Sequence, residues 1–475
     1  MSKGGGKAAM GIIEGFVNWS NNLLWSYVLV VMLVGLGIWF TLRIKFAQLS
    51  MLGEMCRLLK EGTNKEGGQI SSFQAFCIST ASRVGVGNIA GIAIAIMVGG
   101  PGAIFWMWVI ALLGAASGFV ESTLAQIYKV RDPLTGGFRG GPAYYIKYCL
   151  GNSKAAALFA VLISVTFGLC FNSVQSNTIT HSLNAAYGFD RATVGLVLTV
   201  ISAVVIFGGI KRIATLSSWL VPVMATTYLF MAIIVIILNI GELPGMIMDI
   251  VSKAFAPDAA VGGIGAALLT GAKRGLFSNE AGMGSVPNAA ATANVSHPVK
   301  QGLVQALGVF VDTMLVCTAS ACIVLTFDDY ATTGKTGIEL VQLALNDHLG
   351  GIAGIIITVM VFMFAFSSIA GNYYYGESNI QFFSEKPIWL FVFRAMCVAM
   401  VAFGSVASLP FVWNLADLFM AFMAIVNLVA ITILGRNAFI ALQDYQAQKK
   451  AGIANPVFHP EQLPNQQGIT AWGKE

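Results

Sequence analysis

Two short runs of glycine and polar residues interrupt apolar stretches of this sequence, and their residue types could bind a small charged ligand. One run is Ser79–Gly91 and the other is Lys273–Pro287, and each contains the motif Asn-x-Ala-Gly. Each glycine costs a helix about 1 kcal/mol relative to alanine, so such clusters favour unwinding. An unwound helix exposes carbonyls that can bind a cation, and the next helical segment offers N–H groups to a carboxylate. The two runs therefore predict two interrupted helices around a ligand site.

A second interpretation is that these glycines only allow close helix packing, as small residues spaced four apart do in many membrane helices. The pairing of the runs argues against it, because each run opens one half of the chain and each half holds a similar series of apolar stretches. Paired interruptions in corresponding positions of two halves are the best sequence indication of a transporter's central site. The sequence therefore favours a carrier.

The apolar stretch Ala155–Leu183 carries an unusual group of polar side chains. They are Asn172, Ser173, Gln175, Ser176, Asn177 and Thr178. Phe171 and Gln175 lie four residues apart, which places them on one face of a helix. Gln175 is a candidate for a direct ligand contact. The alternative is a hydrogen bond that holds this helix to a neighbour.

Charged residues inside apolar stretches cost about 2.5–3.5 kcal/mol each near the centre of a bilayer, so they mark either function or buried pairs. They are Arg83, Glu121, Lys273, Arg274, Glu280, Asp312, Arg394 and Asp417. Asp312 lies in the middle of its stretch, where an ion pair with Arg83 or Arg274 is one interpretation. Glu280, beside the second run, could be a gate partner or a proton acceptor, and the sequence leaves both open.

The composition indicates that the elements around these residues lie in a membrane. Of 475 residues, 56% are apolar and 10% are charged, with a mean hydropathy of +0.76, whereas soluble domains carry about a quarter charged residues. About 20 apolar residues suffice to cross a bilayer. We predict about eleven spans, at Leu23–Leu42, Phe73–Val98, Gly102–Tyr128, Ala155–Leu183, Thr193–Gly208, Leu216–Ile240, Gly262–Ala293, Gly302–Thr326, Ile352–Phe383, Ile388–Gly404 and Trp413–Leu434. The segment Arg43–Glu61, with mixed basic and apolar residues, is predicted to lie on the membrane surface.

Basic residues are concentrated in alternate loops, of which 43–65 and 129–154 are the richest. The positive-inside rule then places the N-terminus outside and the C-terminus in the cytoplasm, as expected for a multi-pass protein of a bacterial inner membrane. The first apolar run is long enough to span, so we expect no cleavable signal peptide. The polar tail after Arg436 is predicted to be a soluble appendage.

Five motifs resemble the alanine or glycine:cation symporter family. They are Ala-Ser-Arg-Val-Gly-Val-Gly-Asn-Ile-Ala-Gly (81–91), Gly-Gly-Pro-Gly-Ala-Ile-Phe-Trp-Met-Trp (99–108), Phe-Arg-Gly-Gly-Pro-Ala-Tyr-Tyr (138–145), Phe-Ser-Asn-Glu-Ala-Gly-Met-Gly-Ser (277–285) and Gly-Asn-Tyr-Tyr-Tyr-Gly-Glu (371–377). The resemblance implies an all-α LeuT-type fold, with a five-plus-five inverted repeat and one added N-terminal helix. The corresponding parts are an N-terminal helix and amphipathic segment (1–65), two repeats (66–241 and 242–436) and a cytoplasmic tail (437–475).

The resemblance also implies sodium-coupled uptake of a small neutral amino acid, most plainly alanine or glycine. The alternative is sodium- or proton-coupled uptake of glutamine, D-alanine or D-serine, since certain similar members take glutamine or D-alanine. Backbone N–H groups from Gly85 to Asn88 suit the substrate carboxylate, and the carbonyls of 273–277 with the Asn279 side chain suit its ammonium. The candidate substrate residues are Gly85, Gly87, Asn88, Phe171, Gln175, Phe277, Ser278, Asn279, Gly282 and Asn372.

A sodium site is implied where hydroxyls of the ninth span meet carbonyls of the first interrupted helix, since oxygen ligands with few formal charges suit a hard monovalent cation. The residue set implied for cation binding is Ala81, Val84, Ser367, Ser368, Asn88 and Asp312. Taken alone, the two serines would be expected to bond back to their own helix. Sodium is expected as a co-transported ion, and no cofactor is expected.

Other classes of protein fit the sequence less well. The seven cysteines are scattered without CxxC or Cys/His spacing, which gives no indication of a zinc site or of disulfides. A membrane enzyme is disfavoured because neither a Ser/His/Asp set nor HExxH is present. A channel filter would need repeated loops or rings of charge. The net charge of +5 comes from loops between spans and indicates no nucleic-acid partner. An amino-acid-gated channel or a sensor remains the alternative from another class.

Overall fold

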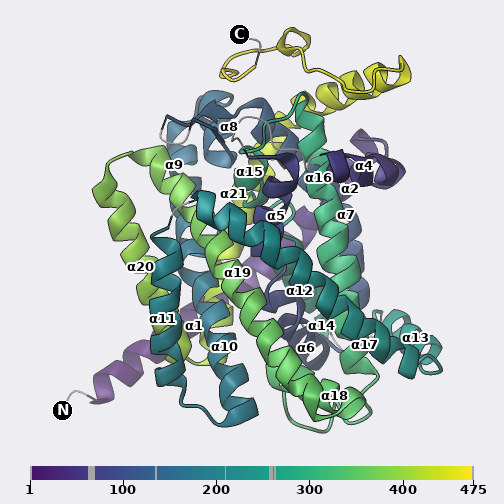
Figure 1. Cartoon of the computed structure of the whole chain (residues 1–475), viewed down its shortest axis with the longest axis vertical. Coiled ribbons are helices and arrows are strands. Elements are labelled where there is room, and N and C mark those ends of the chain that lie inside the picture. The colour runs from purple at the N-terminus through teal and green to yellow at the C-terminus, as the bar shows by residue number, and fades with distance from the viewer. Residues whose placement is uncertain are drawn as a thin grey trace.

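The computed structural model describes residues 3–61, 70–133, 136–208, 210–255, 260–261 and 264–472. Within these residues the chain is almost entirely helical, and its long helices run roughly along the longest axis of the molecule (Figure 1). Two short antiparallel hairpins are present, β1 (Val130–Arg131) with β2 (Phe138–Arg139) and β3 (Ala260–Val261) with β4 (Ile264–Gly265).

The helices follow the apolar pattern of the sequence. In the first half they are α1 (Lys3–Leu23), η1 (Leu24–Leu29), α2 (Val30–Arg43), α3 (Ala47–Ser50), α4 (Leu52–Glu61), α5 (Ser72–Arg83), η2 (Val86–Asn88), α6 (Ala90–Gly99), α7 (Gly102–Ile127), α8 (Pro142–Tyr148), α9 (Ser153–Ile163), η3 (Ser164–Phe171), α10 (Asn172–Tyr187), α11 (Arg191–Ile206) and α12 (Ile210–Leu238). In the second half they are α13 (Leu243–Lys253), α14 (Ala266–Asn279), α15 (Val286–Ala290), α16 (Pro298–Val309), η5 (Phe310–Cys317), α17 (Thr318–Leu325), α18 (Gly337–Leu349), α19 (Gly351–Phe383), α20 (Pro387–Val406), α21 (Leu409–Lys450) and η6 (Pro460–Gln462).

Eight helices among the described residues are long and apolar enough to cross a membrane. They are Gly11–Arg43, Gly102–Ile127, Ser153–Tyr187, Thr215–Leu238, Pro298–Leu325, Gly351–Phe383, Pro387–Val406 and Leu409–Lys450. Three of them contain a π-helical segment, namely η1, η3 and η5. Large apolar side chains such as Ile233 and Trp389 face outward from the bundle. The structure therefore confirms a multi-helical membrane protein.

Two elements stop and restart at the predicted glycine runs. Helix α5 begins at a capping box, in which the side chains of Ser71 and Gln74 each bond the other's backbone, and it ends at Arg83. The chain continues through η2 and resumes as α6. Helix α14 ends at Asn279, and the following residues include three with positive φ, Glu280 (+54°), Gly282 (+82°) and Gly284 (+88°), before α15 begins. Residues 262 and 263, at the start of the predicted seventh span, lie outside the described residues.

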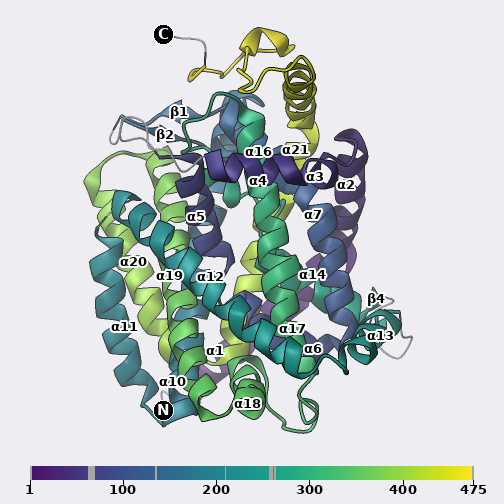
Figure 2. The same cartoon turned by 45° about the vertical axis from the view of Figure 1, so that its right-hand side comes forward.

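The predicted surface segment forms α3 and α4, which lie across one end of the bundle (Figure 2). Helix α4 is held to α21 by a hydrogen bond from the Tyr445 hydroxyl to Glu54 Oε1 (2.5 Å). On the same helix Arg57 binds Glu54 at 2.7 Å, and this bond lowers the pKa of Glu54 to about 2. The amphipathic segment is thus attached to the bundle through a buried tyrosine and a charged carboxylate.

The predicted tail packs on the rest of the molecule, because α21 continues to Lys450 and residues 451–472 fold back over the same end (Figure 1). The Phe458 N–H donates to Ser296 O (3.0 Å), and Trp472 Nε1 donates to Gln126 O (2.9 Å). The rings of Tyr445 and Phe458 flank the buried imidazole of His297, whose pKa burial lowers to about 4. The polar composition of the tail does not indicate this packing, because the packing depends on a few aromatic residues.

Candidate functional site

In the break after α5, two backbone N–H groups donate hydrogen bonds to side chains and a third has no acceptor. The Gly85 N–H donates to Asn88 Oδ1 (3.1 Å), and the Val86 N–H donates to Gln175 Oε1 (3.3 Å). Within the described residues, the Gly87 N–H has no hydrogen-bond acceptor. A buried N–H without an acceptor is costly, so a ligand oxygen at this position would be favourable.

Both glycines of this break are required by close neighbours. A Cβ built on Gly85 would collide with Ser368 Oγ, and one built on Gly87 would lie 2.5 Å from Cδ1 of Phe277. The break is therefore packed directly against α19 on one side and against α14 on the other. No larger residue fits at either position without moving these elements.

Asn88 joins the two breaks. Its Nδ2 donates to Ser278 Oγ (2.9 Å) and to the carbonyl of Asp312 (3.1 Å), its Oδ1 accepts from the Gly85 N–H, and its backbone carbonyl accepts from Ser320 Oγ at 2.5 Å. The Ser278 hydroxyl also lies 3.0 Å from Thr313 Oγ1. The amide has both donor and acceptor ends, so one fully buried side chain holds α5–α6, α14 and η5 together.

The break after α14 has the opposite backbone polarity. Its Gly282 and Gly284 N–H groups donate to the two carboxylate oxygens of Glu121, at 3.0 and 3.1 Å. By contrast, the carbonyls of Phe277, Ser278 and Asn279 accept no hydrogen bond within the described residues. The first break thus presents a free N–H, and the second presents free carbonyls, across the contact between Gly87 and Phe277.

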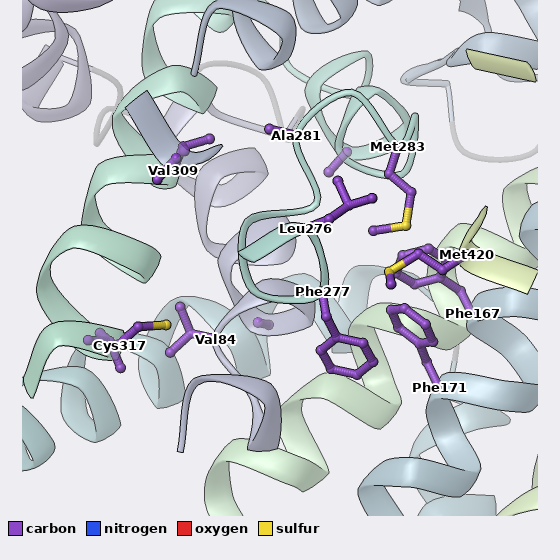
Figure 3. Packing of buried hydrophobic residues seen from close by; sticks show 14 of the residues in the cluster. Val84, Phe167, Phe171, Leu276, Phe277, Ala281, Met283, Val309, Cys317 and Met420 are labelled. Atoms are coloured by element: carbon purple, nitrogen blue, oxygen red, sulfur yellow. The ribbon is translucent and has the colours of Figure 1, made fainter. Parts of the chain in front are cut away.

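Aromatic rings and an ion pair cover this region on the side of α13 and α18. The Phe277 ring stacks on Phe171 at 4.5 Å and lies 4.8 Å from Trp413, and Figure 3 shows Phe277 and Phe171 with their rings side by side. Beyond them, Arg274 Nη2 binds both carboxylate oxygens of Asp417 at 2.5 Å. Arg274 and Asp417 both stand out in the sequence as charges in apolar stretches, but no sequence pattern indicates that they pair.

The two serines of α19 point in different directions. Ser368 Oγ lies 3.0 Å from the carbonyl of Ala81 and 3.2 Å from that of Ser82. Both hydroxyls also approach Phe364 O of their own helix, Ser367 Oγ at 2.9 Å and Ser368 Oγ at 3.0 Å, and Ser367 Oγ lies 3.6 Å from the sulfur of Met224. Of the residues proposed for this cation site, the structure brings together Ser368 and Ala81. Ser367 lies beside Met224 of α12, and the side chain of Val84 lies beside that of Cys317 (Figure 3).

Two other buried carboxylates lie near the breaks. Asp312 Oδ2 is 3.5 Å from Arg83 Nε, so the ion pair considered as an alternative for Asp312 is present. Glu280 accepts from Ser285 Oγ (2.6 Å) and Ser82 Oγ (3.0 Å). The same Ser82 hydroxyl lies 2.6 Å from Oδ1 of Asn372, which brings this candidate residue to the edge of the first break.

Some residues of the site were missed at the sequence level. Thr313 and Asn427 lie in apolar stretches, where a polar side chain is the feature that could have marked them as residues of the site. Asn427 Nδ2 donates both to Glu121 Oε2 (2.7 Å) and to the carbonyl of Gly282 (2.9 Å). Among the described residues, no group of three or more His, Cys, Asp or Glu could hold a metal ion.

Comparison with solved structures supports the fold. The structure of MhsT in complex with L-phenylalanine aligns with a TM-score of 0.58 at 13% sequence identity, covering 82% of this chain and 99% of that one. At this identity the likeness concerns the fold alone, which is of the LeuT type.

Comparison with sequences is more specific. The chain is 54% identical over 463 residues to the probable sodium/glutamine symporter GlnT of Bacillus subtilis, covering 97% of this chain and 96% of that protein. It is 38% identical over 429 residues to the sodium/alanine symporter AgcS of Methanococcus maripaludis, covering 88% and 94%. The model of the sodium:alanine symporter family matches residues 10–460. This chain is a member of the sodium:alanine symporter family, and so a membrane transporter rather than an enzyme.

Proposed function

We propose that the protein takes up a small neutral amino acid, alanine or glycine, together with sodium, by alternating access. The observation that carries the proposal is the opposite polarity of the two facing breaks, with a free N–H at Gly87 and free carbonyls at Phe277–Asn279. A zwitterion needs a donor for its carboxylate and acceptors for its ammonium, and the two breaks supply them on opposite sides of one site. Asn88, Gln175 and Ser278 line the same contact.

The proposed topology has eleven spans. The eight long helices are joined by three shorter elements, namely the α5–α6 pair, α11 and the α14–α15 pair. With one N-terminal helix ahead of two five-span repeats, α5–α6 and α14–α15 each open a repeat. The basic loops then lie at the end where α4, α8 and the C-terminal tail gather (Figure 1), so we assign this end to the cytoplasm and the N-terminus to the outside.

The decisive experiment is uptake into proteoliposomes that contain purified protein, with labelled alanine, glycine or glutamine and an imposed sodium or proton gradient. We expect saturable uptake of alanine or glycine that requires inward sodium. Glutamine is the second candidate, because the relative that is 54% identical is named a probable sodium/glutamine symporter. An uptake rate that saturates as the substrate concentration rises excludes a channel. Uptake driven equally well by a proton gradient without sodium would contradict sodium coupling.

The sodium site can be tested with two adjacent serines. Ser368→Ala removes the hydroxyl that approaches Ala81 O and Ser82 O, so we expect the sodium concentration for half-maximal uptake to rise roughly tenfold. Ser367→Ala is the matched control, because its hydroxyl bonds to Phe364 O and Met224 and to no carbonyl of α5, and its sodium dependence should stay within about twofold of wild type. If the two variants need the same sodium concentration for half-maximal uptake, Ser368 is not a sodium ligand.

A further inference from the structure

Glu121 lies in the last two turns of α7 (Gly102–Ile127) and is fully buried. Its Oε1 accepts from the Gly282 N–H, and its Oε2 accepts from the Gly284 N–H and from Asn427 Nδ2. All three donors are uncharged, and within the described residues no basic side chain lies within 4 Å of this carboxylate. A carboxylate that is ionised at such a buried position costs several kcal/mol, which a purely structural position would seldom keep.

The two N–H groups that Glu121 binds come from the residues that turn the chain between α14 and α15. In an uninterrupted α-helix they would donate to the carbonyls four residues earlier, those of Ser278 and Glu280. Instead the positive φ of Gly282 and Gly284 directs them at α7. Glu280 O accepts from the Met283 N–H (3.2 Å), whereas Ser278 O is left without a donor.

A carboxylate suits this task better than a neutral group of the same shape. Hydrogen bonds to an ionised acceptor are roughly twice as strong as neutral ones, and both oxygens of a carboxylate only accept. A glutamine would accept at one oxygen, but its NH₂ would face the second glycine N–H, donor against donor. One N–H would then be released, and the carbonyls of residues 277–279 in the same break are unused acceptors.

We propose that Glu121 is a positioning residue for the ammonium group of the substrate. By binding the N–H groups of Gly282 and Gly284, it keeps the carbonyls of residues 277–279 free to accept hydrogen bonds from that ammonium. Asn427 assists, because it binds both Glu121 and the Gly282 carbonyl and fixes the turn from the side of α21. This inference rests on the proposed function, since it assigns a role to Glu121 in the recognition of an amino acid.

The test is Glu121→Gln in the full chain, reconstituted in proteoliposomes. We expect the KM for alanine, or for glutamine if that is the substrate, to rise roughly ten- to a hundredfold. We expect kcat and the half-maximal sodium concentration at saturating substrate to stay within about twofold, because the sodium ligands proposed here belong to other elements. Ser122→Ala, at the neighbouring buried position of α7, should leave all three values unchanged.

Loss of kcat or of sodium affinity with an unaltered KM would overturn this inference, because a general packing defect does not single out substrate affinity. If Glu121→Gln does not accumulate in the membrane, Asn427→Ala is the variant to test. It keeps the Glu121 carboxylate and removes one of the three hydrogen-bond donors to it. Its KM should rise several-fold, and a wild-type KM would overturn the inference. A wild-type protein that takes up no amino acid would contradict the proposed function instead.

Discussion

Gly87→Val should abolish amino-acid uptake while the protein still inserts into the membrane. The new Cβ would lie 2.5 Å from Cδ1 of Phe277, and the Phe277 ring cannot yield because it is packed between Phe171 at 4.5 Å and Trp413 at 4.8 Å. A β-branched side chain also restricts the backbone of the break and fills the space that a substrate carboxylate would need. Uptake per amount of membrane-inserted protein is the measurement.

The matched control is Gly35→Val. Gly35 lies in α2 within a membrane-spanning helix, and a Cβ there meets no atom within 4 Å. We therefore expect uptake near the wild-type rate. Normal uptake by Gly87→Val would mean that the contact between the first break and Phe277 plays no part in transport.

Asp417→Asn should lower the stability of the folded protein by about 3–5 kcal/mol, because it leaves the buried guanidinium of Arg274 without its charged partner. Both side chains are 5% exposed, and the bond is bidentate at 2.5 Å. The guanidinium also lies 4.6 Å from the Trp413 ring, a contact that does not replace the lost charge. Thermal unfolding of the purified protein in detergent measures the effect.

Two comparisons identify the cause. Asp249→Asn breaks the exposed ion pair with Lys253 on α13 and should cost no more than about 0.5 kcal/mol. The double change Arg274→Met with Asp417→Leu removes both charges and should recover much of the lost stability, because the buried charge is gone. A double variant as unstable as Asp417→Asn would show that packing, and not the unpaired charge, causes the loss.

The positions of the two breaks were predictable because glycine clusters have a local cost that can be read from composition alone. The choice between Ser367 and Ser368 was not. Neighbouring residues on a helix point about 100° apart, so only one of them can face α5, and the rotation of α19 follows from its packing as a whole. Here Ser368 reaches Ala81 across a sequence separation of 287 residues.

The role of Glu121 was also beyond the sequence. Its charge in an apolar stretch marked it as unusual, but its partners are backbone N–H groups of glycines 161 and 163 residues away. Every residue except proline carries the same backbone N–H donor, so the sequence of residue types does not indicate such a hydrogen bond. The folded tail is a comparable case, since Trp472 bonds to the carbonyl of Gln126.

The π-helical segment η3 makes the register of α10 sensitive to the length of the chain. A π segment amounts to one extra residue inserted in an α-helix, so the helices before and after it are out of phase by about 100°. Removal of one residue from Ser164–Phe171 would let the span become a regular α-helix and would turn Gln175 away from the Val86 N–H. Insertions and deletions of single residues inside this span are therefore a route by which relatives of this protein can change the lining of the site, without any substitution at the two breaks.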